Sequence, residues 1–132
     1  KKAQQRLFFL RKLKRSGLST KLLKNFYRAT IESVLCLSIA VWYGSCTVQE
    51  RKDLAQVVRT AQGIVGCRLQ DLDSICAEQV QRRARHISTD PTHPGNALFA
   101  PLPSGKHFRS LKAKTNKLRN SFFPRAVRAL AP

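Results

Sequence analysis

Hydrophobic side chains recur at helical spacing from the first residues of the chain. With an advance of about 100° per residue, the apolar side chains of residues 2–15 fall within one broad arc of a helix: Ala3, Leu7, Phe9, Leu10 and Leu13. Cations occupy the opposite side, and Phe8 lies among them. Gly17 predicts the end of this helix as a left-handed cap.

A second, longer helix is predicted from Thr20 to Tyr43, with Ser19 as its N-cap. In the first half of this helix, Lys21, Lys24 and Arg28 form a polar stripe. Leu22, Phe26 and Thr30 lie on the opposite face, which is predicted to be buried. From Ser33 to Gln49 no charged residue occurs, which predicts a helix enclosed by protein on most sides and closed by Gly44. The pair Trp42-Tyr43 is interpreted as core edge, with a stacking platform for bases as the alternative.

Two further helices follow. Thr47 and Glu50 have the spacing of a capping box, and the helix that they open ends at Gly66. Its apolar stripe contains Leu54, Val57, Val58, Ala61, Ile64 and Val65. The next helix is predicted over residues 71–88, with inward side chains Leu72, Ile75, Cys76, Val80, Ala84 and Ile87. Acids come early in it and arginines late, as the helix dipole favours.

The pattern changes after residue 88. The stretch "STDPTHPGNALFAPLPSG" has the prolines and glycines of a linker, which Leu98, Phe99 and Leu102 are expected to dock against the helices. Residues 106–120 show no period and are expected to be extended or mobile, and a last short helix is predicted over residues 122–131. The sequence therefore predicts an all-α fold: a small bundle of three to four helices with an irregular, basic C-terminal arm. Its parts are expected at residues 1–66 (helical region), 67–90 (additional helix) and 91–132 (Pro-rich linker and arm).

Charge adds a functional interpretation. The chain has 25 Lys and Arg against 7 Asp and Glu, a net charge of +18. Residues 1–29 hold ten of the cations and residues 91–132 hold eight, and neither range contains an acid. Repulsion on this scale opposes a compact monomer unless a polyanion neutralises it, and Lys and Arg bind phosphates without reading sequence.

The candidate nucleic-acid-binding residues are cations taken from these two ranges. They are Arg11, Lys12, Arg15, Lys21, Lys24 and Arg28 in the first range, and Lys112, Lys114, Lys117 and Arg119 in the second. Phe8 is added because a base can stack on an aromatic ring that cations surround. The alternative for Phe8 is packing under another segment of a larger protein.

Other classes of function find no matching pattern. The longest nearly apolar run, "VLCLSIAVWY", falls short of the roughly 20 residues that span a bilayer, so no membrane partner is expected. Neither paired carboxylates, nor a nucleophile–histidine spacing, nor a Gly-rich phosphate loop indicates catalysis, a cofactor or a small-molecule substrate.

Cysteine spacing bears on metal binding and on location. Cys67, Cys76, His86 and His93 are the right types for a zinc site, but their spacing is looser than usual. We prefer free thiols in a reducing compartment, and therefore expect no bound metal and an intracellular location, nuclear or cytoplasmic.

Several segments resemble one family in its own order. "KKAQQRLFFLRKLKRSGLSTKLLKNFYRATIESVL", "AVWYG" and "RKDLAQVVRTAQGIVG" are similar to the region after the polymerase core of non-LTR (LINE-type) retrotransposon reverse transcriptases. "HPGNALFAPLPSGKHFRSLKAKTNKLRNSFFPRAV" resembles the C-terminal end of the same polyproteins. The resemblance implies that residues 1–66 are a thumb-like region that grips a template–primer duplex, with the rest of a polymerase as partner. The polymerase Asp-Asp motif is missing, so the chain is not expected to be an enzyme on its own.

The first stretch has a second resemblance. "KKAQQRLFFLRKLKRSG" is also similar to a short basic helix at the N-terminus of the AlkB homologue 8 family, whose other domains are a tRNA methyltransferase and an iron/2-oxoglutarate oxygenase. Neither the His-x-Asp…His iron motif nor a Gly-rich methyl-donor loop accompanies it. Neither activity is therefore expected here.

The expected function is to hold RNA or an RNA–DNA duplex through phosphate contacts, as a non-catalytic fragment of a retrotransposon reverse transcriptase. The alternative is a protein-interaction module in which the uncharged segment Ser33–Tyr43 docks on a polymerase core. An affinity that falls steeply with salt concentration indicates binding to nucleic acid, because burial of apolar helices in a protein interface depends much less on salt.

Overall fold

The structure is a computed structural model that describes residues 2–130. It is all-α: across the described residues the backbone forms helices, turns and loops, with an isolated antiparallel bridge between Pro101 and Phe108. The chain divides into two compact units. Unit 1 comprises Lys1–Leu37 and Thr47–Ser74, and unit 2 comprises Ser38–Cys46 and Ile75–Pro132. Within residues 2–130, no helix combines the length and the apolarity needed to cross a membrane.

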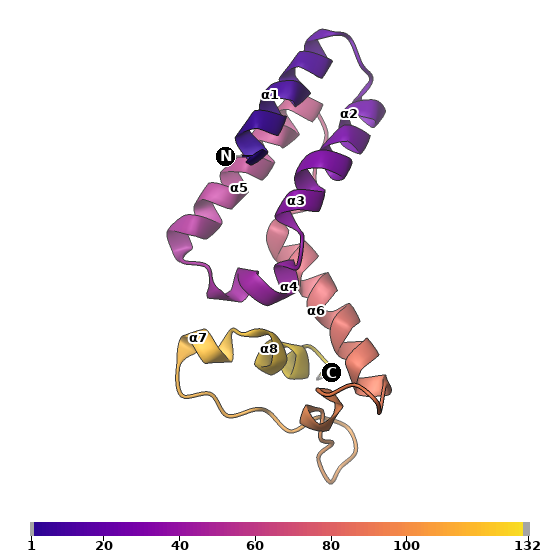
Figure 1. The fold of residues 1–132 in the computed structure, drawn as a ribbon, viewed down its shortest axis with the longest axis vertical. Coiled ribbons are helices and arrows are strands. Elements are labelled where there is room, and N and C mark those ends of the chain that lie inside the picture. The colour runs from indigo at the N-terminus through magenta and orange to yellow at the C-terminus, as the bar shows by residue number, and fades with distance from the viewer. Residues whose placement is uncertain (1, 131–132) are drawn as a thin grey trace. The chain divides into compact units, whose positions relative to one another are not determined.

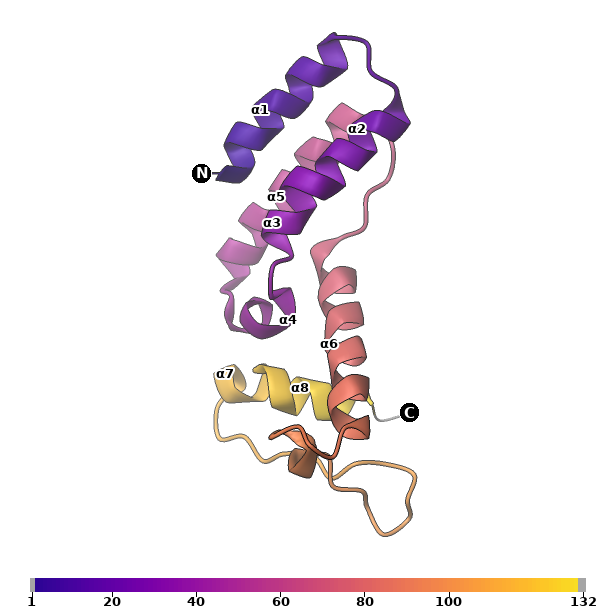
Figure 2. The same cartoon turned by 45° about the vertical axis from the view of Figure 1, so that its right-hand side comes forward.

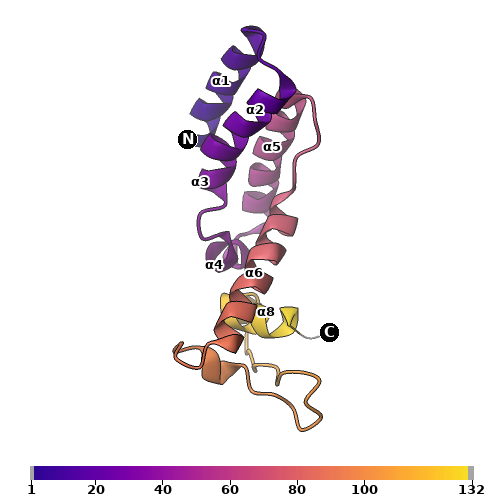
Figure 3. The ribbon, with the colours of Figure 1, turned by 90° about the vertical axis from the view of Figure 1, so that its right-hand side faces the viewer.

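Three helical segments make up unit 1. In Figures 1 and 2, and again in Figure 3, α1 (Lys2–Arg15), α2 (Thr20–Tyr27) and α5 (Val48–Val65) lie side by side. A π-helical turn (Arg28–Glu32) continues α2 into α3 (Ser33–Leu35). The core between them is built from aliphatic side chains and one tyrosine: Leu7, Leu10, Leu23, Tyr27, Ile31, Leu35, Val57, Val58, Ala61 and Val65.

The ends of these helices follow the sequence signals. Ser19 Oγ accepts a hydrogen bond from the Leu22 amide at 3.4 Å. Thr47 and Glu50 form a complete capping box, in which each side chain accepts from the other residue's amide. Gly17 and Gly66 adopt φ angles of +85° and +82°, the left-handed region that glycine enters without steric cost. These predicted caps are confirmed.

The predicted orientation of two side chains is wrong. Leu22 is 52% exposed, and the buried face of α2 instead passes through Leu23 and Tyr27 to Ile31. A spacing of four residues places these three on one face, and that face packs against α1 and α5. Phe9 was expected in the core of α1 but is 47% exposed, because Leu7 and Leu10 define a narrower buried stripe.

The predicted long helix Thr20–Tyr43 is also wrong. The chain turns at Ser38, which has a left-handed φ of 54°, and α4 (Ile39–Trp42) and a 3₁₀ turn (Tyr43–Ser45) follow. Gly44 therefore lies within the 3₁₀ turn. Nor is the uncharged segment enclosed, since Leu37 is 74% exposed in unit 1 and Val41 is 54% exposed in unit 2. The absence of charge did not specify which face of the segment is buried.

Unit 2 is organised by α6 (Leu72–Thr89), which begins in unit 1 and continues in unit 2. All six side chains predicted to face inward from α6 are buried, which confirms that stripe. Ala126 and Val127 of the last helix, α8 (Phe122–Ala129), are buried, and α8 contacts α6 through Arg125, whose Nη1 lies 3.3 Å from Cys76 Sγ. The Trp42-Tyr43 pair is core edge as predicted, because Tyr43 is buried and its ring meets Trp42 edge to face.

Of the three apolar linker side chains expected to dock against the helices, only Phe99 is buried, whereas Leu98 is 38% exposed and Leu102 is half-buried. Phe99 is buried and packs edge to face against Phe108, with 5.7 Å between ring centroids. Asn96, at the start of a 3₁₀ turn (Asn96–Leu98), donates Nδ2 hydrogen bonds to the carbonyl oxygens of Ile87 and Ser88 at 2.9 and 3.1 Å. These bonds help to satisfy the carbonyl groups at the C-terminal end of α6, where the Ile87 oxygen also accepts from the Asp90 amide at 3.3 Å.

The C-terminal arm contains more helix than its sequence predicts. A short helix, α7 (Asn116–Arg119), forms inside the segment expected to be extended. Thr115 caps it by accepting a hydrogen bond from the Leu118 amide at 3.2 Å. The last helix begins at Phe122 as predicted and ends at Ala129 rather than Ala131, which lies outside the described residues.

Candidate nucleic-acid interface

The solvent-facing side of α1 carries the first group of candidate residues. Burial of Leu7 and Leu10 fixes the rotation of the helix. Arg11, Lys12 and Arg15 are exposed as a result. Lys12 and Arg15 also fall in the last turn, where cations offset the negative end of the helix dipole.

Phe8 lies on this side of α1 and is 53% exposed. The Lys12 ammonium sits 5.0 Å from the centroid of its ring, in a cation–π arrangement. The ring of Phe9 meets Phe8 edge to face at 5.9 Å. The structure therefore places Phe8 among cations, so a base stacking there would compete with Lys12 for one face of the ring.

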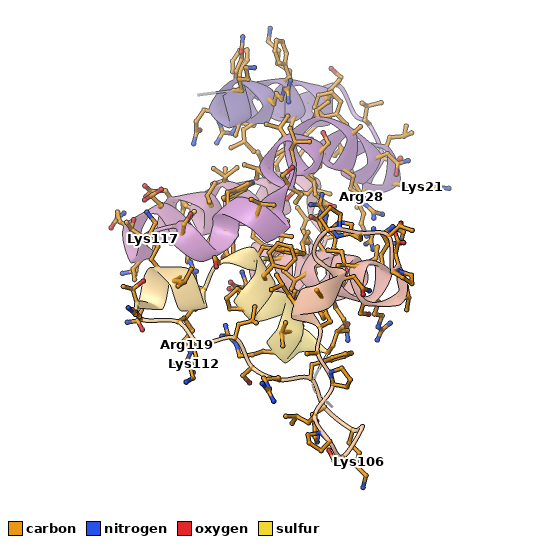
Figure 4. All side chains as sticks on the ribbon, turned by 60° about the horizontal axis from the view of Figure 1, so that its bottom comes forward. Lys21, Arg28, Lys106, Lys112, Lys117 and Arg119 are labelled. Carbon is orange, nitrogen blue, oxygen red and sulfur yellow. The ribbon has the colours of Figure 1, made fainter. Side chains whose placement is uncertain are left out.

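The second group of candidates lies on α2 and the turn after it. Lys21, Lys24 and Arg28 are all exposed, because Leu23 and Tyr27 face the core. Figure 4 shows the Lys21 side chain projecting away from the ribbon. Arg28 differs from the two lysines, since its Nε lies 4.0 Å from a carboxylate oxygen of Glu32 one turn along the chain.

A hollow beside α2 brings two of these cations together. It has a volume of about 130 Å³ and is lined by Lys24, Arg28, Glu32, Leu69 and Gln70. Two cations and amide groups suit a phosphate oxygen, but the Glu32 carboxylate lowers the local positive potential. In unit 1 the free protein therefore already supplies an anionic partner to part of its basic surface.

The candidates of the C-terminal arm lie in unit 2. Lys112, Lys114, Lys117 and Arg119 are all exposed. Figure 4 shows Lys106 on a protruding loop, whereas Lys112 and Arg119 belong to the segment that leads into and through α7. The cap at Thr115 gives this part of the arm a fixed local backbone, which the irregular spacing of its cations did not predict.

Sequence reasoning missed two arginines of α8. Arg128 Nη2 donates a hydrogen bond of 2.8 Å to the backbone oxygen of Arg119. Partial burial, followed by the positive charges of Arg119 and Arg125, lowers the pKa of Arg128 below its ordinary value. Arg119, Arg125 and Arg128 are here called the arginine cluster, because the positive charges of the first two act on the third.

Two members of the arginine cluster, Arg125 and Arg128, line a cavity together with residues of α6. The cavity has a volume of about 250 Å³ and is lined by Ala77, Val80, Arg125, Arg128 and Ala129. The sequence did hold a signal for it, because Arg125 and Arg128 are three residues apart and share a face of a helix. Among the arginines of the acid-free range 91–132, only Arg119 was a predicted candidate.

The two basic ranges belong to different compact units of the chain. Within unit 1 the structure brings Lys24 and Arg28 to one hollow, and within unit 2 it brings Arg119 together with two arginines that were not predicted. Among the described residues, no three His, Cys, Asp or Glu side chains gather where they would hold a metal ion. Cys76 instead contacts the Ile39 carbonyl oxygen at 3.7 Å inside unit 2.

Comparison with known protein families finds a match to the beginning of the chain. Residues 1–33 match a family model described as alkylated DNA repair protein alkB homolog 8, N-terminal, which covers 33 of the 132 residues. The matched stretch contains α1 and α2. No curated protein and no solved structure matches the chain. The resemblance of the first segment to the AlkB homologue 8 family is thus confirmed, whereas the reverse-transcriptase resemblance gains no support.

Proposed function

We propose that the chain is a non-catalytic module that binds RNA or an RNA–DNA duplex through the phosphate backbone. The observation that carries the proposal is the arginine cluster of unit 2, in which Arg128 bonds to the Arg119 backbone and lines one cavity with Arg125. The cluster lies within a range of the sequence that contains eight cations and no acid. Mutual repulsion raises the free energy of the unbound cluster, and a phosphate placed beside it removes that cost. The exposed cations of α1 and α2 extend the same chemistry to unit 1.

Contacts of this kind fix a nucleic acid without reading its bases. We therefore expect equal affinity for short RNA duplexes of two unrelated sequences, measured by fluorescence anisotropy. The double variant Arg119→Gln/Arg128→Gln lowers affinity for both duplexes alike, by on the order of tenfold at low salt. The control Lys52→Gln/Arg59→Gln removes the same charge from exposed positions of α5 and has a smaller effect. Equal losses in the two variants, or a loss confined to one sequence, would contradict the proposal.

A finer form of the proposal concerns the parent protein. The quoted segments favour a LINE-type reverse transcriptase, in which unit 1 would act as part of the thumb on a template–primer duplex. The reading frame that encodes the chain tests this. An aromatic-x-Asp-Asp motif upstream supports the polymerase, and its absence from the complete frame contradicts it.

The match over residues 1–33 favours a second candidate. In that case the chain carries the N-terminal segment of an AlkB homologue 8-type protein, without the oxygenase or methyltransferase activity of that family. A complete frame that encodes a His-x-Asp…His motif supports this candidate. The two candidates also differ in ligand preference, because only an alkylation-repair context predicts tighter binding to an alkylated duplex than to an unmodified duplex of the same charge.

A further inference from the structure

Unit 2 contains a larger cavity that the proposed phosphate contacts do not use. It has a volume of about 350 Å³ and is lined by Arg83, His86, Ile87, His93, Phe122 and Phe123. These residues come from the C-terminal half of α6, from the linker and from the start of α8. The volume lies at the small end of the roughly 300–1,000 Å³ typical of ligand clefts.

One wall of the cavity is aromatic and closely packed. The rings of Phe122 and Phe123 meet edge to face with 5.1 Å between centroids, and both side chains are half-buried. Ile87, which is 6% exposed, adds aliphatic surface. At Gly95 an added Cβ would lie 2.6 Å from Cε1 of Phe123, so this ring packs directly on backbone. The wall is therefore held in place without a ligand.

The polar side chains that line the cavity are one arginine and two histidines. Arg83 and His86 are exposed, and His93 is half-buried. The Gly95 amide donates a hydrogen bond of 2.9 Å to His93 Nδ1. In the neutral ring this bond places the proton on Nε2, which remains available as a donor to a ligand.

Asp90 is an acid close enough to interact electrostatically with both of these histidines. Hydrogen bonds from Thr92, then the charges of His86 and His93, lower the pKa of this carboxyl group. Its Oδ1 accepts from the Thr92 amide at 3.0 Å and from the Thr92 hydroxyl at 2.6 Å. The carboxylate is thus engaged with Thr92 in its own turn, and Asp90 is not among the residues that line the cavity.

We propose that this cavity binds one unpaired base of an RNA strand, with the adjoining phosphate on Arg83. A base combines a flat π surface with hydrogen-bonding edges, and proteins recognise unpaired bases by stacking on aromatic rings beside cations. The aromatic wall, the fixed His93 donor and the arginine provide these three features in one unit. This inference rests on the proposed binding to RNA phosphates and adds a preference for single-stranded ends or bulges.

The test compares three RNA duplexes: one with a blunt end, one with a short single-stranded overhang, and one whose overhang has the same phosphates but no bases. The full chain binds the base-containing overhang roughly 10-fold more tightly than the abasic one, as expected for stacking of a single base. Phe122→Leu/Phe123→Leu keeps apolar volume, removes the rings and abolishes this difference while leaving blunt-duplex affinity unchanged. Equal affinity of the wild-type chain for the two overhangs overturns the inference.

A measurement on the unchanged chain locates the site. The chain has three histidines, of which His107 lies outside the cavity and serves as an internal control. The base-containing overhang shifts the imidazole NMR signals of His86 and His93 and leaves His107 unchanged, whereas the abasic overhang shifts none of them. Shifts of His86 and His93 by an acidic peptide that competes with the overhang overturn the assignment to a base. If instead blunt duplexes fail to bind in a salt-dependent way, the proposed function itself is wrong.

Discussion

The two units hold their positive charge in different ways. In unit 1 the cations project from regular helices, and several of them contact groups of the same unit. Arg6 Nη1 donates a 2.6 Å hydrogen bond to the Thr30 carbonyl oxygen, Lys12 covers the ring of Phe8, and Arg28 pairs with Glu32. In unit 2 the cations of the C-terminal arm lie on short helices and irregular backbone, and the charges that act on Arg128 are those of other arginines.

This difference separates two kinds of basic surface. A cation that pairs with a carboxylate in the free protein must weaken that attraction before it binds a phosphate. Arg128 and Arg125 instead contact a backbone carbonyl oxygen and a sulfur atom, and a phosphate beside them also offsets the repulsion within the arginine cluster. We therefore expect the arm of unit 2 to contribute more binding free energy per cation than the helices of unit 1. Four predictions test this comparison and the packing that underlies it.

The largest expected effect comes from removing three cations at once. Lys112→Gln/Lys114→Gln/Lys117→Gln lowers affinity for any RNA sequence alike and reduces the slope of log Kd against log salt by about 2–3, since each phosphate contact contributes roughly 0.9. The matched unit 1 variant Lys12→Gln/Lys24→Gln/Arg28→Gln lowers the slope less, because two of its cations already contact Phe8 or Glu32. If the slope decreases more in the unit 1 variant than in the unit 2 variant, the expected difference between the two units is wrong.

The next effect concerns stability, at one glycine in each unit. In unit 2, a Cβ added at Gly44 would collide with the backbone carbonyl of Asn120, so Gly44→Ala costs about 1–3 kcal/mol of unfolding free energy. In unit 1, Gly63 lies inside α5 with nothing within 4 Å of an added Cβ, so Gly63→Ala stabilises by roughly 0.5–1 kcal/mol. Urea unfolding measures both changes in unfolding free energy. If both substitutions stabilise the protein, or both destabilise it, the packing described for the two glycines is wrong.

A smaller effect is expected at the start of α6. The Ser74 amide donates a 2.7 Å hydrogen bond to Asp71 Oδ1, and this bond lowers the pKa of Asp71. Because the pKa is lowered in the folded state, the stabilisation is present above the ordinary pKa of about 4 and is lost as pH falls through the folded value. Asp71→Ala costs about 1 kcal/mol at pH 7.

The control for this cap is Asp71→Asn, which keeps a side-chain oxygen as hydrogen-bond acceptor but removes the ionisable carboxyl group. Urea unfolding at pH 7 and in acid separates the two variants. The penalty of Asp71→Ala shrinks in acid, where the wild-type carboxyl group is itself protonated. A penalty of the same size at both pH values shows that the charge of Asp71 contributes nothing to the cap.

The smallest effect is a gain of affinity. Glu32→Gln releases Arg28 and removes the one acid that lines the small hollow of unit 1. Affinity for RNA duplexes rises roughly two- to fivefold, the range set by an exposed ion pair. The change is read by anisotropy at low salt, and a fall in affinity would show that the pair positions Arg28 for binding.

Much of the fold could be read from the sequence where several local signals agreed. The sequence correctly predicted the inward stripe of α6, the capping box at Thr47 and the left-handed glycines. Periodicity and capping depend on residues that are close together in the sequence. The turn at Ser38 was not, since neither Gly nor Pro marks it and the uncharged segment carries no face preference. The buried face of α2 likewise depends on which helices pack against it.

In the candidate site, too, the sequence predicted features set by neighbouring residues and missed those that depend on tertiary contacts. Exposure of the cations on α1 and α2 followed from helix periodicity. The arginine cluster did not, because a hydrogen bond between Arg128 and the backbone of Arg119 joins two segments that local pattern treats separately. The aromatic cavity of unit 2 required the linker and α8 to meet α6, which is a tertiary event.

The salt dependence of binding tests the central claim most directly. For the full chain and an RNA duplex, log Kd should rise linearly with log salt, with a slope that corresponds to several phosphate contacts at roughly 0.9 each. The slope should be the same for two unrelated sequences. An affinity that barely changes with salt, while the chain stays folded, would contradict the account.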